Sequence, residues 1–390
     1  MDPLPRSADV VIIGGGIMGV STAYNLVKRG MKNVVVIEKD EFFGEESTGK
    51  CAGGIRYQFS SKVNIELSKL SIPIFERFKE EFDQDIDLNF CGYLFILGTE
   101  EYVEDFKKRV ALQRSLGVET EWLTPDDIHR KVPLLNMEGI LAGTFHHKDG
   151  LADPSSVVQG YVKQAHRLGA TLVTETRVTG IRVDKGKISA VETDKGVVET
   201  GIVVNATGAW SREIGKMVGV DIPVDPFRRQ ITVTAPLEEI PPDLPMVVEF
   251  PNGLYFHRES GGLLTGMSNP NDPPTFSTAV DPDWMLVNLE ALVHRLPVAE
   301  KARIKTSWAG LYEVTPDAHP IMGKMPEPEG FYCVAGFSGH GFMHGPGAGI
   351  LMAEEIIDGR AHTVNIDRLR YERFLEPGAI ERMEAERGVI

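Results

Sequence analysis

The sequence DVVIIGGGIMGVSTAYNLVKRGMKNVVVIEKD, residues 9–40, contains the signals that decide the fold. An apolar run at residues 10–13 is typical of a parallel strand that is buried on both faces. The glycines that follow have the spacing G-x-G-x-x-G. In this pattern Gly14 permits the tight turn, Gly16 lets the backbone approach a pyrophosphate, and Gly19 lets the next helix pack against the strand. The stretch predicts a nucleotide-binding unit with phosphates at a helix N-terminus.

The acid at the end of the second strand narrows the choice of ligand. Glu38 follows an apolar run at Val34–Ile37, and its carboxylate can accept hydrogen bonds from ribose hydroxyls. The same charge would repel a 2′-phosphate, so FAD or NAD is expected rather than NADP. A second buried run at residues 202–206 leads into ThrGlyAlaTrpSer at residues 207–211 and repeats the order of strand, small residues and helix.

Length and composition restrict the class of protein. The chain has 390 residues, 42% of them hydrophobic, which predicts two structural domains that share an interface. The formal net charge of -15 argues against sequence-independent nucleic-acid binding and against binding to an anionic membrane surface. No apolar run approaches the ~20 residues of a spanning helix, and residues 1–7 lack the apolar core of a secretion signal. We therefore expect a cytoplasmic protein with neither a nucleic-acid nor a membrane partner.

The middle of the chain has the pattern of a sheet. Strand candidates at residues 230–234, 246–250, 253–256 and 263–265 alternate with proline-rich loops and predict an antiparallel sheet. A last helix is expected from about residue 350 to residue 358.

With these features and GFSGHGF at residues 336–342, the chain resembles the D-amino-acid-oxidase-like family of flavoproteins. That family includes sarcosine oxidases, glycine oxidase, dimethylglycine dehydrogenase and certain L-proline dehydrogenases. The resemblance covers nearly the whole chain. The other motifs that support the resemblance are GGGIMG at residues 14–19, Glu38, SerThrGly at 47–49, AsnAlaThrGlyAlaTrp at 205–210 and the run at 308–323.

The resemblance implies an α/β fold with a discontinuous Rossmann-like FAD-binding domain and an α+β substrate domain whose antiparallel sheet covers the flavin ring. The expected FAD-binding parts are residues 1–87, 149–222 and 308–365. The expected substrate-domain parts are residues 88–148 and 223–307, and residues 366–390 form a C-terminal tail.

FAD is the implied cofactor, and the turn at residues 339–342 suits it on physical grounds. Backbone N–H groups at the start of a helix attract negative charge, which a reduced flavin carries. The residues expected to bind FAD are Gly14, Gly16, Ile17, Met18, Gly19, Glu38, Lys39, Ser47, Thr48, Lys50, Cys51, Ala52, Val178, Thr207, Gly208, Trp210, Gly310, Tyr312, Gly339, His340, Gly341, Phe342 and Met343.

The substrate side has one cationic anchor that the family supports. Arg56 in GGIRYQF matches an arginine that holds the substrate carboxylate in monomeric sarcosine oxidase, and a guanidinium fork suits that task. The alternatives for Arg56 are a surface arginine or a pyrophosphate ligand. Met343 occupies the position of a second, lysine anchor, which is therefore missing. Tyr312 and Tyr255 are candidates to orient the substrate or are core aromatics.

Other departures from the family modify these expectations. Gly310 stands where monomeric sarcosine oxidase has the cysteine that links FAD, so FAD is expected to be non-covalent. Leu264 matches the lysine that assists oxygen reduction, which favours a dehydrogenase. Pro154 matches the histidine that holds FMN in a related subunit, so no FMN is expected. His146 and His147 do not predict a metal site, because neighbouring residues rarely converge on one ion.

The expected activity is oxidation of a small secondary or N-methylated amino acid, such as sarcosine, to its imine, with O2 or another electron acceptor. L-proline dehydrogenase is the nearest enzymatic alternative. A flavin-carrying subunit or assembly factor without turnover is the alternative of another class. A partner subunit and a homo-oligomer both stay open, and the tail at residues 366–390 either docks a partner or caps the domain.

Overall fold

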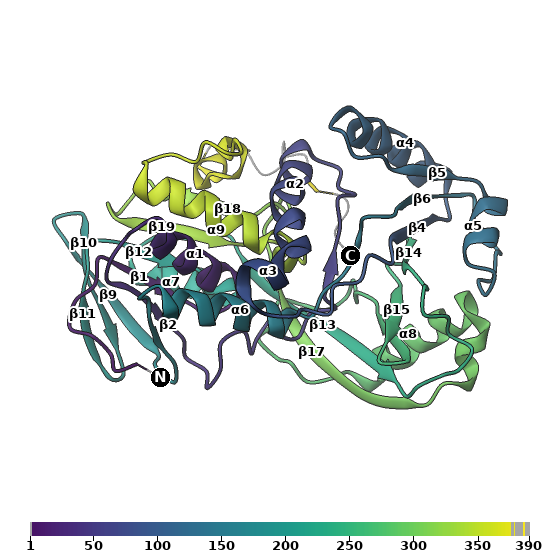
Figure 1. Cartoon of the computed structure of the whole chain (residues 1–390), viewed down its shortest axis with the longest axis horizontal. Coiled ribbons are helices and arrows are strands. Elements are labelled where there is room, and N and C mark those ends of the chain that lie inside the picture. Colours follow the sequence, from purple (N-terminus) through teal and green to yellow (C-terminus); the bar gives the residue numbers. More distant parts are fainter. Residues whose placement is uncertain (1, 376–377, 379–384, 387–390) are drawn as a thin grey trace.

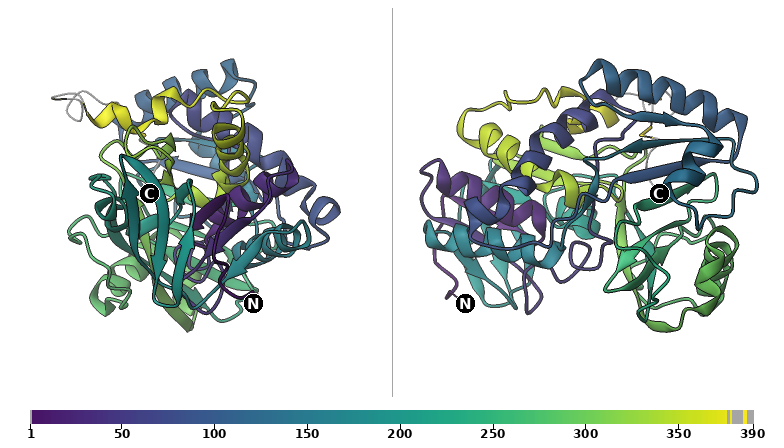
Figure 2. Two further views of the ribbon diagram at one scale, coloured as in Figure 1. Left: turned by 90° about the vertical axis from the view of Figure 1, so that its left-hand side faces the viewer. Right: turned by 45° about the vertical axis from the view of Figure 1, so that its right-hand side comes forward.

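The computed structural model describes residues 2–375, 378 and 385–386, and its strands form two large sheets (Figures 1 and 2). The six-stranded sheet has the order β18-β19-β12-β1-β2-β8, parallel except for β18 at one edge. Its strands are β1 (Val10–Ile13), β2 (Val34–Ile37), β8 (Thr171–Val173), β12 (Val203–Asn205), β18 (Ile321–Lys324) and β19 (Phe331–Ala335).

Burial on both faces explains the apolar run of β1. Val10 and Ile12 pack into the core beneath the helices, while Val11 and Ile13 pack into a separate core on the other face. The second core lies under the three-stranded sheet of β9 (Val178–Asp184), β10 (Lys187–Thr193) and β11 (Gly196–Glu199) and under α7 (Ser211–Met217). Because neither face meets water, no polar alternation is needed along β1.

The helices of the first core pack on one another as well as on the sheet. α1 (Ile17–Lys28) contacts both α9 (Gly341–Ile357) and α6 (Pro154–Arg167), and α9 also contacts α2 (Lys62–Glu76). α9 begins at Gly341, so the expected start near residue 350 was wrong. The other helical elements are α3 (Phe78–Phe82), α4 (Glu100–Ser115), α5 (Pro125–Lys131), α8 (Pro282–Arg295), η1 (Gly208–Trp210), η2 (Pro297–Lys301), η3 (Asp367–Leu369) and η4 (Tyr371–Phe374).

The second large sheet has eight strands in the order β17-β13-β16-β15-β14-β4-β6-β5. They are β4 (Tyr93–Leu97), β5 (Glu121–Leu123), β6 (Ala142–His146), β13 (Asp225–Thr234), β14 (Met246–Phe250), β15 (Tyr255–Glu259), β16 (Gly262–Gly266) and β17 (Ile304–Val314). All neighbours are antiparallel except β4 and β14. The strands predicted in the middle of the chain, β13 to β16, pair antiparallel with one another as expected. The parallel pair joins β14 to β4, which comes from a separate part of the chain, so no hairpin connects them.

The α/β fold expected from the sequence is confirmed, whereas the division into six segments stays a prediction. The expected boundary at residue 308 falls inside β17, which pairs with β13 from Ile304 to Val314. β17 therefore extends from the eight-stranded sheet toward the six-stranded one (Figure 1). A small two-stranded sheet pairs β3 (Gly54–Ile55) with β7 (Gly150–Leu151).

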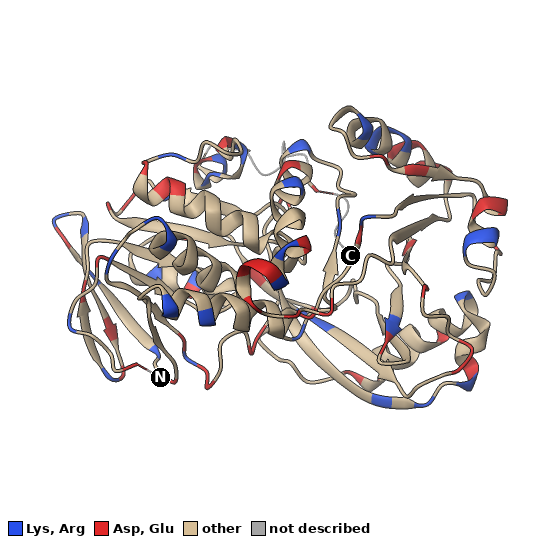
Figure 3. Cartoon of the chain, in the orientation of Figure 1, with Lys and Arg blue, Asp and Glu red and all other residues tan. Residues whose placement is uncertain are grey.

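Charged residues are spread over loops, helices and some strands, while α9 is largely uncharged (Figure 3). Among the described residues no helix is both long enough and apolar enough to cross a membrane.

Candidate functional site

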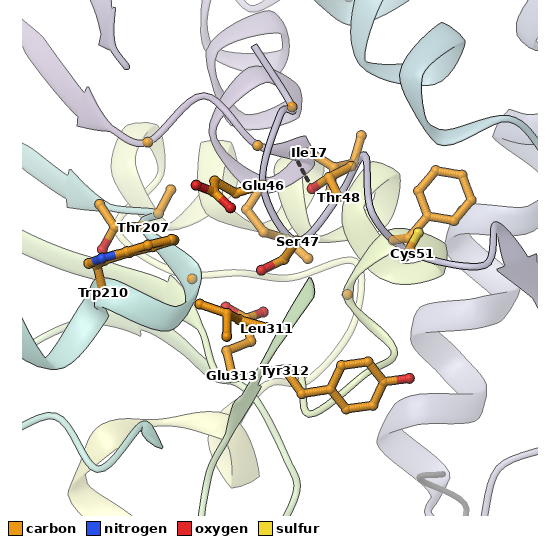
Figure 4. Close-up of a pocket in the computed structure, with 18 of the residues that line it drawn as sticks. Ile17, Glu46, Ser47, Thr48, Cys51, Thr207, Trp210, Leu311, Tyr312 and Glu313 are labelled. Carbon is orange, nitrogen blue, oxygen red and sulfur yellow. Dashed lines mark hydrogen bonds between the residues drawn. The ribbon is translucent and has the colours of Figure 1, made fainter. Parts of the chain in front are cut away.

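A cavity of about 260 Å³ opens where β1, the loop after β2, β17 and the turn before α9 meet (Figure 4). All of the predicted site residues line it except Gly19, Lys50 and Gly310. A Cβ on Gly19 would lie 1.9 Å from the carbonyl oxygen of Gly14, so Gly19 allows the close approach of α1 to the glycine turn. A Cβ on Gly310 would lie 3.0 Å from the Cβ of Lys50, which places these two residues against each other outside the cavity lining.

The glycine turn and Glu38 form the dinucleotide end of the cavity. Gly14 has a φ of +105°, and a Cβ there would meet the carbonyl oxygen of Ala206 at 2.4 Å. Glu38 accepts hydrogen bonds from the N–H groups of Gly15 at 2.7 Å and Asp40 at 2.9 Å. Burial raises the pKa of Glu38, and these two bonds partly offset that rise.

The loop after β2 closes this end with ionic and aromatic contacts. Glu46 pairs with Lys39 at 3.3 Å and with Lys50 at 2.7 Å. The ammonium group of Lys39 also lies 4.3 Å from the ring centroid of Trp210. Thr48 accepts a hydrogen bond from the N–H of Ile17 at 3.3 Å, which holds the loop over the start of α1 (Figure 4).

Arg56 lies at the other end of the cavity. Its side chain is 4% exposed, its guanidinium carbon is 3.9 Å from the ring centroid of Phe59, and it donates to the carbonyl oxygen of Gln58. Burial lowers the pKa of Arg56, but a guanidinium remains charged in proteins. Asp149 braces the loop by accepting from the N–H of Tyr57 at 2.7 Å and from Nε2 of Gln58 at 2.9 Å. Arg56 is therefore a buried cation at the wall of the cavity.

Asp149 also contacts His146, one of the two histidines that were not predicted to bind a metal ion. Nδ1 of His146 lies 2.9 Å from Oδ1 of Asp149. Within the described ranges, no group of three histidine, cysteine, aspartate or glutamate side chains is arranged to hold a metal ion.

Two tyrosines line the cavity together with Arg56, and a second arginine lies behind one of them. Tyr312 and Tyr255 line the cavity, and burial raises the pKa of both phenols, so both are neutral hydrogen-bond donors near neutral pH. The guanidinium carbon of Arg229 lies 5.2 Å from the ring centroid of Tyr312. Nε of Arg229 is buried without a hydrogen-bond partner among the described residues. The sequence reasoning missed Arg229, although residues 228–229 are both arginine and a strand directs neighbouring side chains to opposite faces.

His340 begins the turn at the N-terminus of α9. Its Nε2 lies 3.1 Å from the carbonyl oxygen of Ala318, and its Nδ1 lies 3.1 Å from Nδ1 of His344. Burial lowers the pKa of His340 to about 3, so its ring is neutral near neutral pH. The positive end of α9 at this turn is therefore supplied by backbone N–H groups rather than by a charged imidazole.

Glu313 is one of several cavity residues that sequence reasoning missed, among them Tyr93 and Met246. It follows Tyr312 on β17, and Figure 4 shows it with Leu311 on the side facing Ser47, Thr207 and Trp210, while Tyr312 points the other way. The alternation of a strand was the available signal, because Leu311 and Glu313 must share a face.

These residues fit FAD. The glycine cradle would be filled by any side chain at residue 14, Glu38 is placed for ribose, and the N-termini of α1 and α9 both border one cavity. Such a fold and site define a dinucleotide-dependent oxidoreductase. The chain belongs to the FAD dependent oxidoreductase family, whose model matches residues 9–355. FAD is its cofactor, as the sequence predicted.

Three comparisons describe its relatives. The chain is 31% identical to FAD-dependent oxidoreductase domain-containing protein 1 of Xenopus laevis over 95% of this chain and 83% of that protein. It is 32% identical to mitochondrial sarcosine dehydrogenase of Homo sapiens over 92% of this chain, but it spans only 40% of that protein. The crystal structure of L-proline dehydrogenase from P. horikoshii aligns with a TM-score of 0.89 and 34% identity, covering 95% of this chain and 99% of that chain.

Proposed function

We propose that the protein oxidises a small secondary or N-methylated amino acid, of the sarcosine kind, to its imine. The observation that carries this proposal is the guanidinium of Arg56, buried at the wall of the cavity that also contains the flavin-binding motifs. A buried cation beside a substrate cavity selects an anionic group, and a carboxylate matches the guanidinium fork. The similarity to sarcosine dehydrogenase supports the same substrate class.

The neighbours of Arg56 have complementary roles in this proposal. Arg56 holds the carboxylate, and the phenol of Tyr312 donates a hydrogen bond that orients the molecule. Met246, Val248 and Met343 supply apolar surface in the same cavity. This surface excludes water and disfavours an ammonium ion, so the substrate amine is held unprotonated, with its lone pair available to form the imine. Bound FAD supplies the hydride acceptor.

L-proline is the second candidate substrate. Proline is also a secondary amine with an adjacent carboxylate, so Arg56 and Tyr312 would serve it in the same roles. The specific observation in its favour is the similarity to the L-proline dehydrogenase structure, which extends over nearly all of both chains.

The test is anaerobic mixing of the yellow holoprotein with sarcosine, dimethylglycine, L-proline, glycine and D-alanine in turn. Bleaching by sarcosine, dimethylglycine or L-proline identifies the substrate, and the rate at which colour returns in air separates an oxidase from a dehydrogenase. Bleaching by none of the panel contradicts the proposal and favours a flavin-carrying subunit without turnover.

The Arg56→Ala variant tests the carboxylate anchor. Losing a buried, charge-assisted interaction costs about 2–5 kcal/mol, so the substrate concentration for half-maximal bleaching should rise at least tenfold while FAD stays bound. Arg56→Lys keeps the charge but loses the fork, and it should fall between Arg56→Ala and the wild type. The control is Arg182→Ala, an exposed residue that pairs with Glu192. An unchanged half-maximal concentration in Arg56→Ala would contradict the assignment.

A further inference from the structure

Glu313 lies between two turns that border the cavity. A Cβ on Gly208, in η1, would lie 2.8 Å from Oε2 of Glu313, and a Cβ on Gly341, at the start of α9, would lie 3.5 Å from Oε1. Both glycines line the cavity with Glu313. The side chain of Glu313 is half-buried, and its exposed part faces this cavity. A cofactor in the cavity would cover the carboxyl group.

The carboxyl group has little to compensate a negative charge. Its Oε1 accepts a hydrogen bond from the N–H of Phe337 at 3.3 Å. The N–H of Gly336 also acts on the carboxyl group, but no lysine, arginine or histidine forms an ion pair with it among the residues that the structure describes. Leaving a charge buried without a counter-charge is strongly unfavourable.

FAD makes the ionised form still less favourable. The cofactor carries negative charge on its two phosphate groups, and filling the cavity removes the water that now reaches Glu313. Repulsion and desolvation act in the same direction, toward a protonated carboxyl group. A protonated carboxyl is also a hydrogen-bond donor, and the hydroxyl and phosphate oxygens of FAD are acceptors.

We infer that Glu313 is a cofactor-binding residue that is protonated in the complex with FAD, so that FAD binding takes up one proton at this carboxyl group. The resemblance to the family assigns flavin binding to positions before and after Glu313 in the chain, such as Tyr312 and Gly339. It assigns no role to Glu313 itself. The inference concerns cofactor binding and is independent of which amino acid is oxidised.

The titration of the free site supports this assignment. Burial raises the pKa of Glu313 to about 7, although N–H groups of Phe337 and Gly336 oppose the rise. The titratable groups on the elements around it behave differently. Asp225 on β13 is paired with Arg212 at 3.2 Å, burial raises the pKa of the Cys333 thiol on β19, and burial lowers the pKa of His340 to about 3. We therefore expect Glu313 to change charge near neutral pH.

The experiment titrates the apoprotein with FAD by calorimetry in two buffers of different ionisation enthalpy, which gives the number of protons taken up. At about pH 8 the wild type should take up close to one proton, and its Kd for FAD should rise about tenfold per pH unit above about pH 7. Glu313→Gln keeps the shape and a hydrogen-bond donor, so it should bind FAD with a Kd that no longer rises. Asp225→Asn is the matched control, and it should take up protons as the wild type does.

Two results would overturn the inference. One is a wild type that takes up no proton at about pH 8, a measurement that needs no variant. The other is proton uptake that persists in Glu313→Gln, which would show that another cavity carboxylate, such as Glu38, takes up the proton. If Glu313→Gln fails to fold, Glu313→Asp serves instead, because its shorter side chain should change the pH at which uptake begins while leaving a titratable group.

Discussion

At the scale of single residues, Gly339 lies directly against the ring of Tyr312. Gly339 has a φ of +99°, and a Cβ there would lie 2.3 Å from Cε2 of Tyr312. Gly339→Ala therefore combines backbone strain of about 1–3 kcal/mol with overpacking of about 1–3 kcal/mol, unless the tyrosine ring moves. We expect a lower Tm together with weaker bleaching by the substrate, measured by thermal unfolding and by anaerobic titration of the flavin.

Gly117→Ala is the matched control for this prediction. Gly117 has a φ of +81°, but a Cβ there would meet nothing within 4 Å. Its alanine variant carries the backbone strain alone, so the difference between the two variants measures the contact with Tyr312. Equal losses of stability in both variants, with unchanged bleaching, would contradict the role of Gly339.

The residues missed from the sequence have a common physical cause. The glycine turn and Glu38 are recognisable because adjacent residues in one strand-turn-helix unit create their function. Arg229 and Glu313 take their environments from neighbours across the fold, such as the ring of Tyr312 and the glycines of two distant turns. Neither environment is visible in a single sequence, because burial and the absence of a counter-charge are properties of the packed structure.

At the scale of elements, the C-terminal region caps α2. Oε1 of Glu386 accepts from the N–H of Ser60 at 2.9 Å, and Oε2 accepts from the N–H of Ser61 at 3.1 Å and from Nδ2 of Asn64 at 3.0 Å. An acid at this end also interacts favourably with the helix dipole. Glu386→Gln should therefore lower the free energy of unfolding by about 1–3 kcal/mol at neutral pH. Whether the predicted tail at residues 366–390 docks a partner stays open, and residues 376–377, 379–384 and 387–390 lie outside the described part of the chain.

The effect of Glu386→Gln on the free energy of unfolding should depend on pH in a definite direction. Burial alone would raise the pKa of Glu386, but hydrogen bonds from Ser60, Ser61 and Asn64 lower it to about 2. A lowered pKa stabilises the fold above the unfolded value of about 4.5, and the stabilisation is lost as the pH falls toward about 2. Denaturant unfolding should show the difference between Glu386→Gln and wild type shrinking over that range. Glu104→Gln, at an exposed pair with Lys107, should differ little at any pH.

Helix α9 shows where pattern reasoning failed at this scale. Its first turns contain Gly345, Pro346, Gly347 and Gly349, which have low helix propensity and delayed the expected start to about residue 350. Tertiary packing overrides that preference. A Cβ on Gly345 would meet Ile17 at 2.3 Å, and one on Gly349 would meet the backbone of Ser21 at 2.6 Å, so the glycines let α9 approach α1. Strands with strong apolar runs, such as β1 and β2, were located correctly because their signal is local.

At the scale of the whole molecule, the cavity is lined by residues from Ile13 to Met343, and most of the chain must fold before it exists. FAD should therefore bind the native state and not the unfolded chain. At a free concentration of about 100 times its Kd, a ligand of this kind adds about 2.7 kcal/mol to the free energy of unfolding. The Tm of the apoprotein should rise with each addition of FAD, as measured by thermal unfolding followed by circular dichroism. A Tm that is independent of added FAD would contradict a cavity built from the whole fold.

Acid precipitation decides whether the flavin is covalently attached, and the resemblance to the family predicts that it is not. Gly310 has no side chain that could form a link, and Cys51, which lines the cavity, has a thiol whose pKa burial raises, so its reactive thiolate form is suppressed. Acid precipitation of the holoprotein should release all of the yellow colour into the supernatant. Readdition of FAD to apoprotein prepared under milder conditions should restore the higher Tm. Colour retained in the acid pellet would show a covalent bond, and Cys51→Ser would then test whether that cysteine forms it.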